Sequence, residues 1–135
     1  MNAVDTNVLA RFFVTDNDDA ESLKQQPAAI RAMSGKVFVS ASVVLEFEWI
    51  LRGFYEFPRV QIQGILEALC GLENVQLENR GTILAALNAY QSGLDFADAL
   101  HLASAGSASS FISFDQRLKK RSQSLGLTPK VDTPI

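Results

Sequence analysis

Short apolar stretches alternate with amphipathic helical stretches along the whole chain, and this alternation is the sequence feature that most restricts the fold. The expected strands cover residues 1–4, 37–40, 75–77, 109–114 and 130–131, and the first of them is expected to be buried. The expected helices cover residues 8–13, 20–33, 42–54, 59–69, 82–91, 95–105 and 116–125, with Pro27 predicted to kink or split the second. This order is typical of an α/β fold, in which helices cover both faces of a parallel sheet through right-handed crossovers.

Length and composition favour one folded domain over residues 1–135. Apolar residues make up 47% of the chain and charged residues 20%, which is enough to form a hydrophobic core. The net charge is −3, so the chain lacks the basic excess of many nucleic-acid-binding domains. Any binding of phosphate groups must therefore come from a local basic patch or from bound cations.

The chain is expected to act in the cytoplasm and without a membrane. No apolar run approaches the length of about 20 residues that a membrane span requires. The carboxylate of Asp5 follows the start at once, which is unlike a signal peptide. Cys70 is the only cysteine, so it is expected to be a small buried side chain and not half of a disulfide.

Two carboxylates three residues apart stand in the apolar stretch Leu94–His101. Gly93 can end one helix and Asp95 can cap the next, which places Asp98 in the first helical turn. An acid in that turn is favoured by the partial positive charge of the helix N-terminus. Capping alone would explain both carboxylates, so these residues by themselves leave a functional role open.

Three further acids join Asp98 as candidates for a common site. Asp5 and Asp115 each follow a predicted strand, and ligands of open parallel sheets bind beyond the carboxyl ends of the strands. On a helical wheel Glu46 falls at the margin of an apolar face, where it needs a partner. Glu48 falls beside Arg52 and is expected to lie at the surface.

Four converging carboxylates point to a hard cation. Oxygen ligands without cysteine favour magnesium or manganese over zinc. Such a bound ion can hold phosphate oxygens, activate water and stabilise a leaving oxygen. The residues therefore indicate phosphodiester hydrolysis.

The four acidic stretches together resemble the motifs of PIN-domain ribonucleases, and of VapC-type toxins in particular. The matching stretches, in order, are Val4–Leu9, Val43–Glu46, Asp95–Leu100 and Ser113–Leu118. The resemblance covers essentially the whole chain. It implies a three-layer α/β/α sandwich with a central parallel sheet, and a magnesium- or manganese-dependent endoribonuclease.

By this resemblance Asp5, Glu46, Asp98 and Asp115 form the acidic metal cluster. Asp95 would be a further acid of the site or only a helix cap. Ser113 stands where the family often has threonine, and its hydroxyl is expected to orient a neighbouring carboxylate or water. Thr6 and Asn7 match the first motif and would hydrogen-bond around the metal.

The resemblance also implies partners. Family members of the toxin type commonly form homodimers and are held inactive by a small VapB-type antitoxin. The substrate would be RNA, and DNA would be contacted only indirectly, through the antitoxin.

Three other features have a structural and a functional interpretation. His101 is expected to be a packed, hydrogen-bonded side chain, although a general base is conceivable. The basic run Arg117–Arg121 is either a solvated helix face or a contact for the RNA backbone. The aromatic turn around Tyr55 either packs in the core or stacks on bases.

Other functional classes are distinguished by single residues. A receiver-type phosphotransfer domain needs paired acids after its first strand, and a haloacid-dehalogenase-type phosphatase needs Asp-x-Asp, whereas this chain has Asp5-Thr6-Asn7. The main alternative to a nuclease is a PIN-like module that binds RNA or protein without cutting. Loss of metal-stimulated cleavage in Asp5→Asn would separate the two.

Overall fold

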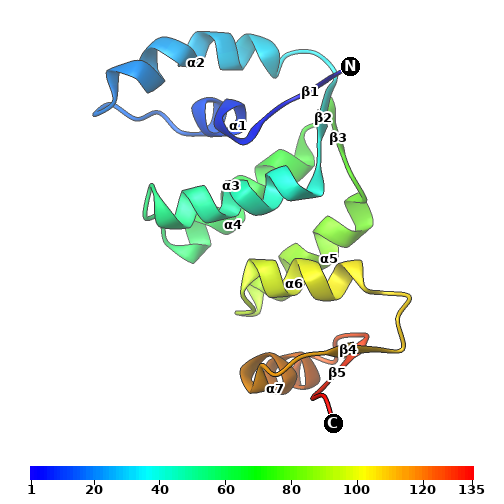
Figure 1. The fold of residues 1–135 in the computed structure, drawn as a ribbon. Coiled ribbons are helices and arrows are strands. Elements are labelled where there is room, and N and C mark those ends of the chain that lie inside the picture. Colours follow the sequence, from blue (N-terminus) through cyan, green and yellow to red (C-terminus); the bar gives the residue numbers. More distant parts are fainter. The chain divides into compact units, whose positions relative to one another are not determined.

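The computed structural model describes residues 1–135, which form two compact units, residues 1–80 and residues 81–135. Both combine helices with parallel strands, as the alternating sequence pattern predicts (Figure 1).

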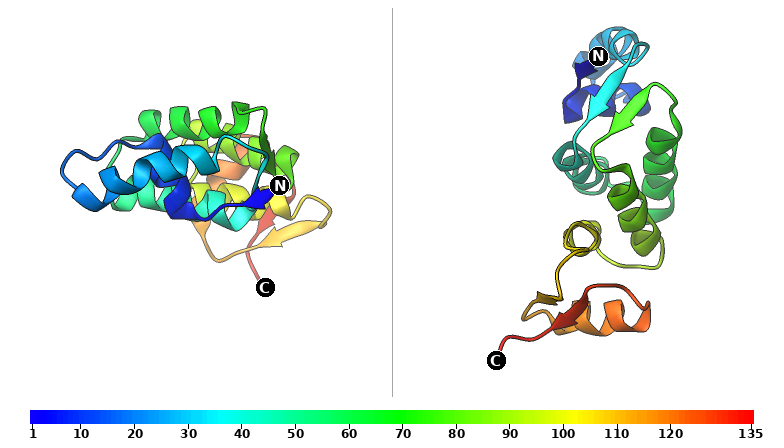
Figure 2. Two further views of the ribbon diagram at one scale, coloured as in Figure 1. Left: turned by 90° about the horizontal axis from the view of Figure 1, so that it is seen from above. Right: turned by 90° about the vertical axis from the view of Figure 1, so that its right-hand side faces the viewer.

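The N-terminal unit contains a three-stranded parallel sheet in the order β1-β2-β3. Asn2 pairs with Val37, and Val37 pairs with Val75, so the three strands run in register from the same end. Figure 2 shows β2 and β3 side by side. The elements are β1 (Asn2–Ala3), α1 (Thr6–Phe13), α2 (Ala20–Ala32), β2 (Val37–Val39), α3 (Ala41–Gly53), α4 (Arg59–Gly71) and β3 (Val75–Leu77).

Polar caps explain where the helices of this unit begin. Asp5, Asp19 and Ser40 are the N-caps of α1, α2 and α3, and each side chain accepts a backbone N–H of the first turn. Asp5 follows β1 by two residues and Ser40 follows β2 directly, so each cap turns the chain from the sheet into a helix. Both helices therefore start at the carboxyl ends of their strands.

The C-terminal unit contains a parallel pair of strands, with Ser110 opposite Lys130 and Ile112 opposite Asp132. Helix α7 packs against β5 (Figure 1). The elements are α5 (Arg80–Gln91), α6 (Phe96–Ser104), β4 (Ser110–Ile112), α7 (Gln116–Ser124) and β5 (Lys130–Asp132), and α5 begins at the last residue of the N-terminal unit.

Buried apolar side chains occur in both units. Phe13 and Phe47 contact each other in the N-terminal unit with ring centroids 5.8 Å apart. Tyr90 and Phe96 meet edge to face in the C-terminal unit at 5.5 Å. Cys70 is buried and free, as predicted.

Three local expectations were wrong. The first strand was expected to be buried, but Asn2 and Ala3 are both exposed. Pro27 does not split α2, which runs unbroken through it from Ala20 to Ala32. The expected strand over residues 109–114 is shorter, because β4 ends at Ile112 and the chain turns there toward Asp115.

No helix is both long and apolar enough to cross a lipid bilayer.

Candidate functional site

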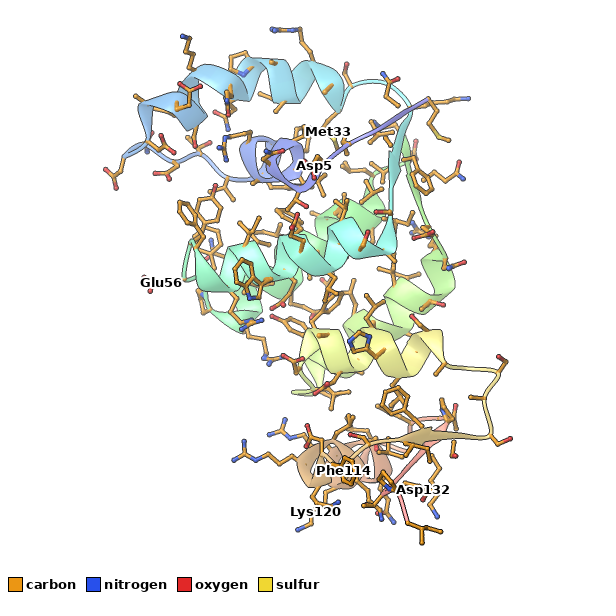
Figure 3. All side chains as sticks on the ribbon, in the orientation of Figure 1. Asp5, Met33, Glu56, Phe114, Lys120 and Asp132 are labelled. Atoms are coloured by element: carbon orange, nitrogen blue, oxygen red, sulfur yellow. The ribbon has the colours of Figure 1, made fainter.

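Asp5, Thr6 and Glu46 form a hydrogen-bonded group in the N-terminal unit. Asp5 lies at the junction of β1 and α1 (Figure 3), where its Oδ1 accepts the backbone N–H of Thr6 at 2.7 Å. The Thr6 side chain, of which only 2% is exposed, donates its hydroxyl to Glu46 Oε1. Thr6 therefore connects Asp5 to Glu46, which lies 40 residues after Thr6 in the chain.

The buried face of α3 corrects the interpretation of its two glutamates. Val44, Phe47, Glu48 and Leu51 are the buried residues of this helix, and their i, i+3, i+4, i+7 spacing defines one face. Glu48, expected at the surface, is 1% exposed and accepts the Arg52 Nε–H at 3.0 Å. Glu46, expected at the margin of the apolar face, is exposed. The helical wheel assigns the buried face by residue type. Glu48 nevertheless lies on that face, where Arg52 is its cationic partner.

In the C-terminal unit, Asp95 and Asp98 lie at the start of α6. Asp95 is the N-cap, and its Oδ2 accepts the Asp98 backbone N–H at 3.2 Å. The carboxylate of Asp98 is not needed for this cap and stays available for another partner. The two acids of the motif thus have different positions: one ends the turn before the helix, and the other stands in its first turn.

Asp115 is fixed by hydrogen bonds of both its side chain and its backbone. Its Oδ1 accepts the backbone N–H of Leu118 at 3.0 Å, which caps α7. Its own N–H donates to Ser113 Oγ at 3.0 Å. The Ser113 hydroxyl therefore fixes the backbone of the neighbouring acid. A carboxylate has about four lone-pair sites, so capping leaves Asp115 able to bind a cation as well.

Asp98 experiences the negative charges of its neighbours. Burial is the largest effect that raises the pKa of the Asp98 carboxyl, and the charges of Asp95 and Asp115 raise it further. Asp95 and Asp115 are therefore each close enough to Asp98 to repel its negative charge. A bound cation would remove that repulsion, which fits the chemistry of an oxygen-ligated magnesium or manganese ion.

His101 departs from its predicted environment. It was expected to be packed, but it is exposed in the last turn of α6, because the buried residues of this helix are Phe96, Ala99, Leu100 and Leu102. Its charge lowers the pKa of Asp98 and so partly opposes the neighbouring acids. A direct role for His101 in proton transfer has no geometric support beyond this proximity.

The basic run on α7 separates into residues with different surroundings. Arg121 donates to the backbone carbonyl of Gly93, and Lys119 lines a cavity of about 270 Å³ that Lys130 also lines. Lys120 is exposed and projects from α7 (Figure 3). The sequence did not indicate the contact between Arg121 and Gly93, since no local pattern connects residues 28 positions apart.

The aromatic turn between α3 and α4 is partly exposed. Phe54 is 68% exposed, which is contrary to core packing, whereas Tyr55 and Phe57 stack on each other at 5.5 Å. Burial raises the pKa of the Tyr55 phenol. One face of the Tyr55 ring is therefore already covered by Phe57.

The predicted acids are thus grouped within each unit. Asp5 and Glu46 are connected through Thr6 in the first, and Asp98 and Asp115 interact electrostatically in the second. Neither unit by itself brings three histidine, cysteine or carboxylate side chains within reach of one metal ion. Magnesium commonly uses only one or two carboxylates together with water and substrate phosphate, so each pair has an adequate donor set.

Comparison with known families decides the classification. The sequence model of the PIN domain family matches residues 3–123. The chain belongs to the PIN domain family. The matched range includes all four predicted acids, and the α/β fold class expected from the sequence is confirmed.

Membership supports a nuclease-type function, since PIN domains are generally nucleases. No curated protein sequence matches the chain.

Proposed function

We propose that this PIN domain is a magnesium- or manganese-dependent endoribonuclease of the VapC toxin type, acting in the cytoplasm. The single observation that carries the proposal is the half-buried carboxyl of Asp98: burial raises its pKa most, and the nearby charges of Asp95 and Asp115 raise it further. Acids arranged so that they repel one another destabilise a fold unless a cation compensates them. In a nuclease such carboxylates would bind the metal ion, whereas capping a helix does not require carboxylates that repel one another.

Asp98 and Asp115, together with Asp5 and Glu46, would hold the metal ion. When bound, the ion supplies Lewis-acid polarisation of the phosphodiester and lowers the pKa of water. The chemistry of the donor set fits, because all four side chains are carboxylates.

The remaining residues of the motifs orient these carboxylates. Thr6 donates to Glu46 and so fixes one of its oxygens, while the other oxygen stays free. Ser113 and the backbone N–H of Leu118 fix the position of Asp115. Such supporting hydrogen bonds preserve ligand geometry and typically contribute about 10–100-fold to metal affinity or activity.

Exposed cations on α7 would hold the RNA backbone. Arg117 and Lys120 are both exposed and follow Asp115 by two and five residues. Each phosphate that such a side chain neutralises makes binding more sensitive to salt. These residues would supply the local positive charge that the net charge of −3 does not.

The proposed partners are those of a toxin. A small VapB-type antitoxin would block the acidic site, the active form would be a homodimer, and the complex would reach DNA only through the antitoxin. Expression of the chain alone should arrest bacterial growth, and co-expression of the antitoxin should relieve the arrest.

The experiment is cleavage of total bacterial RNA by the purified chain without antitoxin. Reactions contain magnesium, manganese or EDTA, with Asp98→Asn as the inactive variant and Asp18→Asn, an exposed loop acid, as its matched control. Discrete fragments with either metal, absent in EDTA and in Asp98→Asn but present in Asp18→Asn, are expected. Mapping the fragment ends would identify the RNA and the cut.

Intact RNA in every reaction, from folded protein, would contradict the nuclease proposal. Binding of RNA without cleavage in the same reactions would instead establish the non-cleaving module.

A further inference from the structure

The turn between α5 and α6 ends one helix and aims the next. Gly93 N–H donates to the Tyr90 carbonyl at 3.0 Å, and Leu94 N–H donates to the Ala89 carbonyl at 3.1 Å. These two bonds form a Schellman motif with Gly93 at the left-handed position, where its φ is +104°. Asp95 follows directly and caps α6, so the turn sets the position of Asp98.

Arg121 holds this turn from α7. Its Nη1 donates to the Gly93 carbonyl oxygen, which takes no part in the Schellman motif. A Cβ at position 93 would stand 3.0 Å from Nη1, so the glycine provides both the left-handed backbone and the room for the guanidinium. Because the donor is charged, the bond is stronger than a neutral one.

The same bond connects the elements that carry two of the acids. Helix α7 begins at its cap Asp115 and holds Arg121 in its last turn, while the Gly93 turn begins α6 with Asp98. The negative charges of Asp98 and Asp115 repel each other. A cation that ties α7 to the start of α6 opposes the separation that this repulsion favours.

We propose that Arg121 is a positioning residue, which fixes the distance between Asp98 and Asp115 through the Gly93 carbonyl instead of binding RNA phosphates. This inference rests on the proposed metal-dependent nuclease. Both Arg121 and Lys120 are exposed, but Arg121 donates to the Gly93 carbonyl and would act on the acids, whereas Lys120 would act on the RNA backbone.

The test compares Arg121→Ala with Lys120→Ala, its neighbour on the same helix. Three properties of the full chain are measured: hydrogen exchange of the amides of residues 94–98, affinity for Mn²⁺ alone, and cleavage of a synthetic RNA containing the mapped cut. Gly93→Ala strains the turn itself and serves as a positive control for faster exchange. Circular dichroism checks that each variant is folded.

For Arg121→Ala we expect faster exchange of residues 94–98, weaker Mn²⁺ binding, and a kcat lowered by about 10–100-fold with KM nearly unchanged, because misplacement of about 1 Å can cost 100-fold. Its KM should keep the salt dependence of the wild type.

For Lys120→Ala we expect the reverse: unchanged exchange and Mn²⁺ affinity, a raised KM, and a salt slope reduced by about one. Gly93→Ala should also speed the exchange of residues 94–98, because a side chain at φ +104° strains the turn itself.

Unchanged exchange and Mn²⁺ affinity in Arg121→Ala, or a raised KM with a reduced salt slope, would overturn the positioning role. Failure of the nuclease proposal would look different, because the wild type itself would then leave RNA intact while the exchange and Mn²⁺ measurements could still be made.

Discussion

The two units of this PIN domain stabilise their acidic side chains in different ways. In the N-terminal unit a single threonine serves both acids, since Thr6 gives its N–H to Asp5 and its hydroxyl to Glu46. In the C-terminal unit Asp98 is surrounded by like charge from Asp95 and Asp115. The first arrangement uses hydrogen bonds within its unit, whereas the second places like charges next to a half-buried carboxyl. The C-terminal acids should therefore respond most strongly to metal.

The largest expected effect is the loss of cleavage in Asp98→Asn and in Asp115→Asn. Each variant removes a negative ligand while keeping nearly the same shape. We expect kcat to fall by more than about 100-fold, because removal of even a supporting partner of a metal ligand costs about 10–100-fold. Single-turnover cleavage of a defined RNA measures this fall. Activity within about threefold of the wild type would show that the crowded acids have no role in the reaction.

A smaller loss is expected when the N-terminal acids lose their shared donor. Thr6→Val keeps the shape of the side chain but removes the hydroxyl that Glu46 accepts. We expect cleavage to fall by about 10–100-fold, as for other supporting partners of metal ligands. Thr6→Ser restores the hydroxyl and should recover most of the activity. Equal activity in Thr6→Val and the wild type would mean that Glu46 needs no orientation.

The effect of salt should separate RNA binding from metal binding. Arg117→Ala removes an exposed cation two residues after Asp115 and leaves the acids unchanged. We expect KM for RNA to rise by a few fold and its dependence on salt to fall by about one phosphate contact. Titrations between low and physiological salt measure both. A lowered kcat at constant KM would contradict the assignment of Arg117 to the RNA backbone.

The smallest effect concerns the stability of the metal-free chain. Burial and the charges of Asp95 and Asp115 raise the pKa of Asp98 in the folded state, so its ionisation costs more there than in the unfolded chain. The stability of the fold therefore gains as pH falls from neutral through this raised pKa, and the gain is complete below the unfolded pKa. In EDTA at pH 7.5, Asp98→Asn should melt about 1–3 °C higher than the wild type, a small shift because the side chain is half-exposed.

Thermal melts at pH 7.5 and pH 5 test the sign of this effect. The advantage of Asp98→Asn should shrink at the lower pH, and added Mn²⁺ should stabilise the wild type more than the variant. A variant that melts lower than the wild type in EDTA would mean that Asp98 is stabilising without metal.

The sequence predicted the order of the elements well because the strands and helices differ in their hydrophobic period. Caps such as Asp95 and Asp115 were also predictable, because a capping acid stands next to the helix that it starts. Val37 and Val39 in β2 are buried as the apolar pattern requires. Local chemistry therefore carries most of the information about where elements begin.

Long-range pairing was not readable. The local pair of Glu48 and Arg52 was predicted, but the burial of Glu48 was not, because a helical wheel that sorts residues by polarity assigns a charged side chain to the surface. The bond from Arg121 to Gly93 and the bond from Thr6 to Glu46 join residues 28 and 40 positions apart. Only the folded chain places these partners together.

The most direct test of the account is a titration of the full chain with Mn²⁺, followed by electron paramagnetic resonance. Wild type, Asp98→Asn, Asp5→Asn and the control Asp18→Asn are compared at the same pH. The account predicts that the wild type and the control bind Mn²⁺ alike, that Asp98→Asn weakens binding most, and that Asp5→Asn also weakens it. Equal affinity in all four proteins would contradict the claim that these carboxylates hold a metal ion.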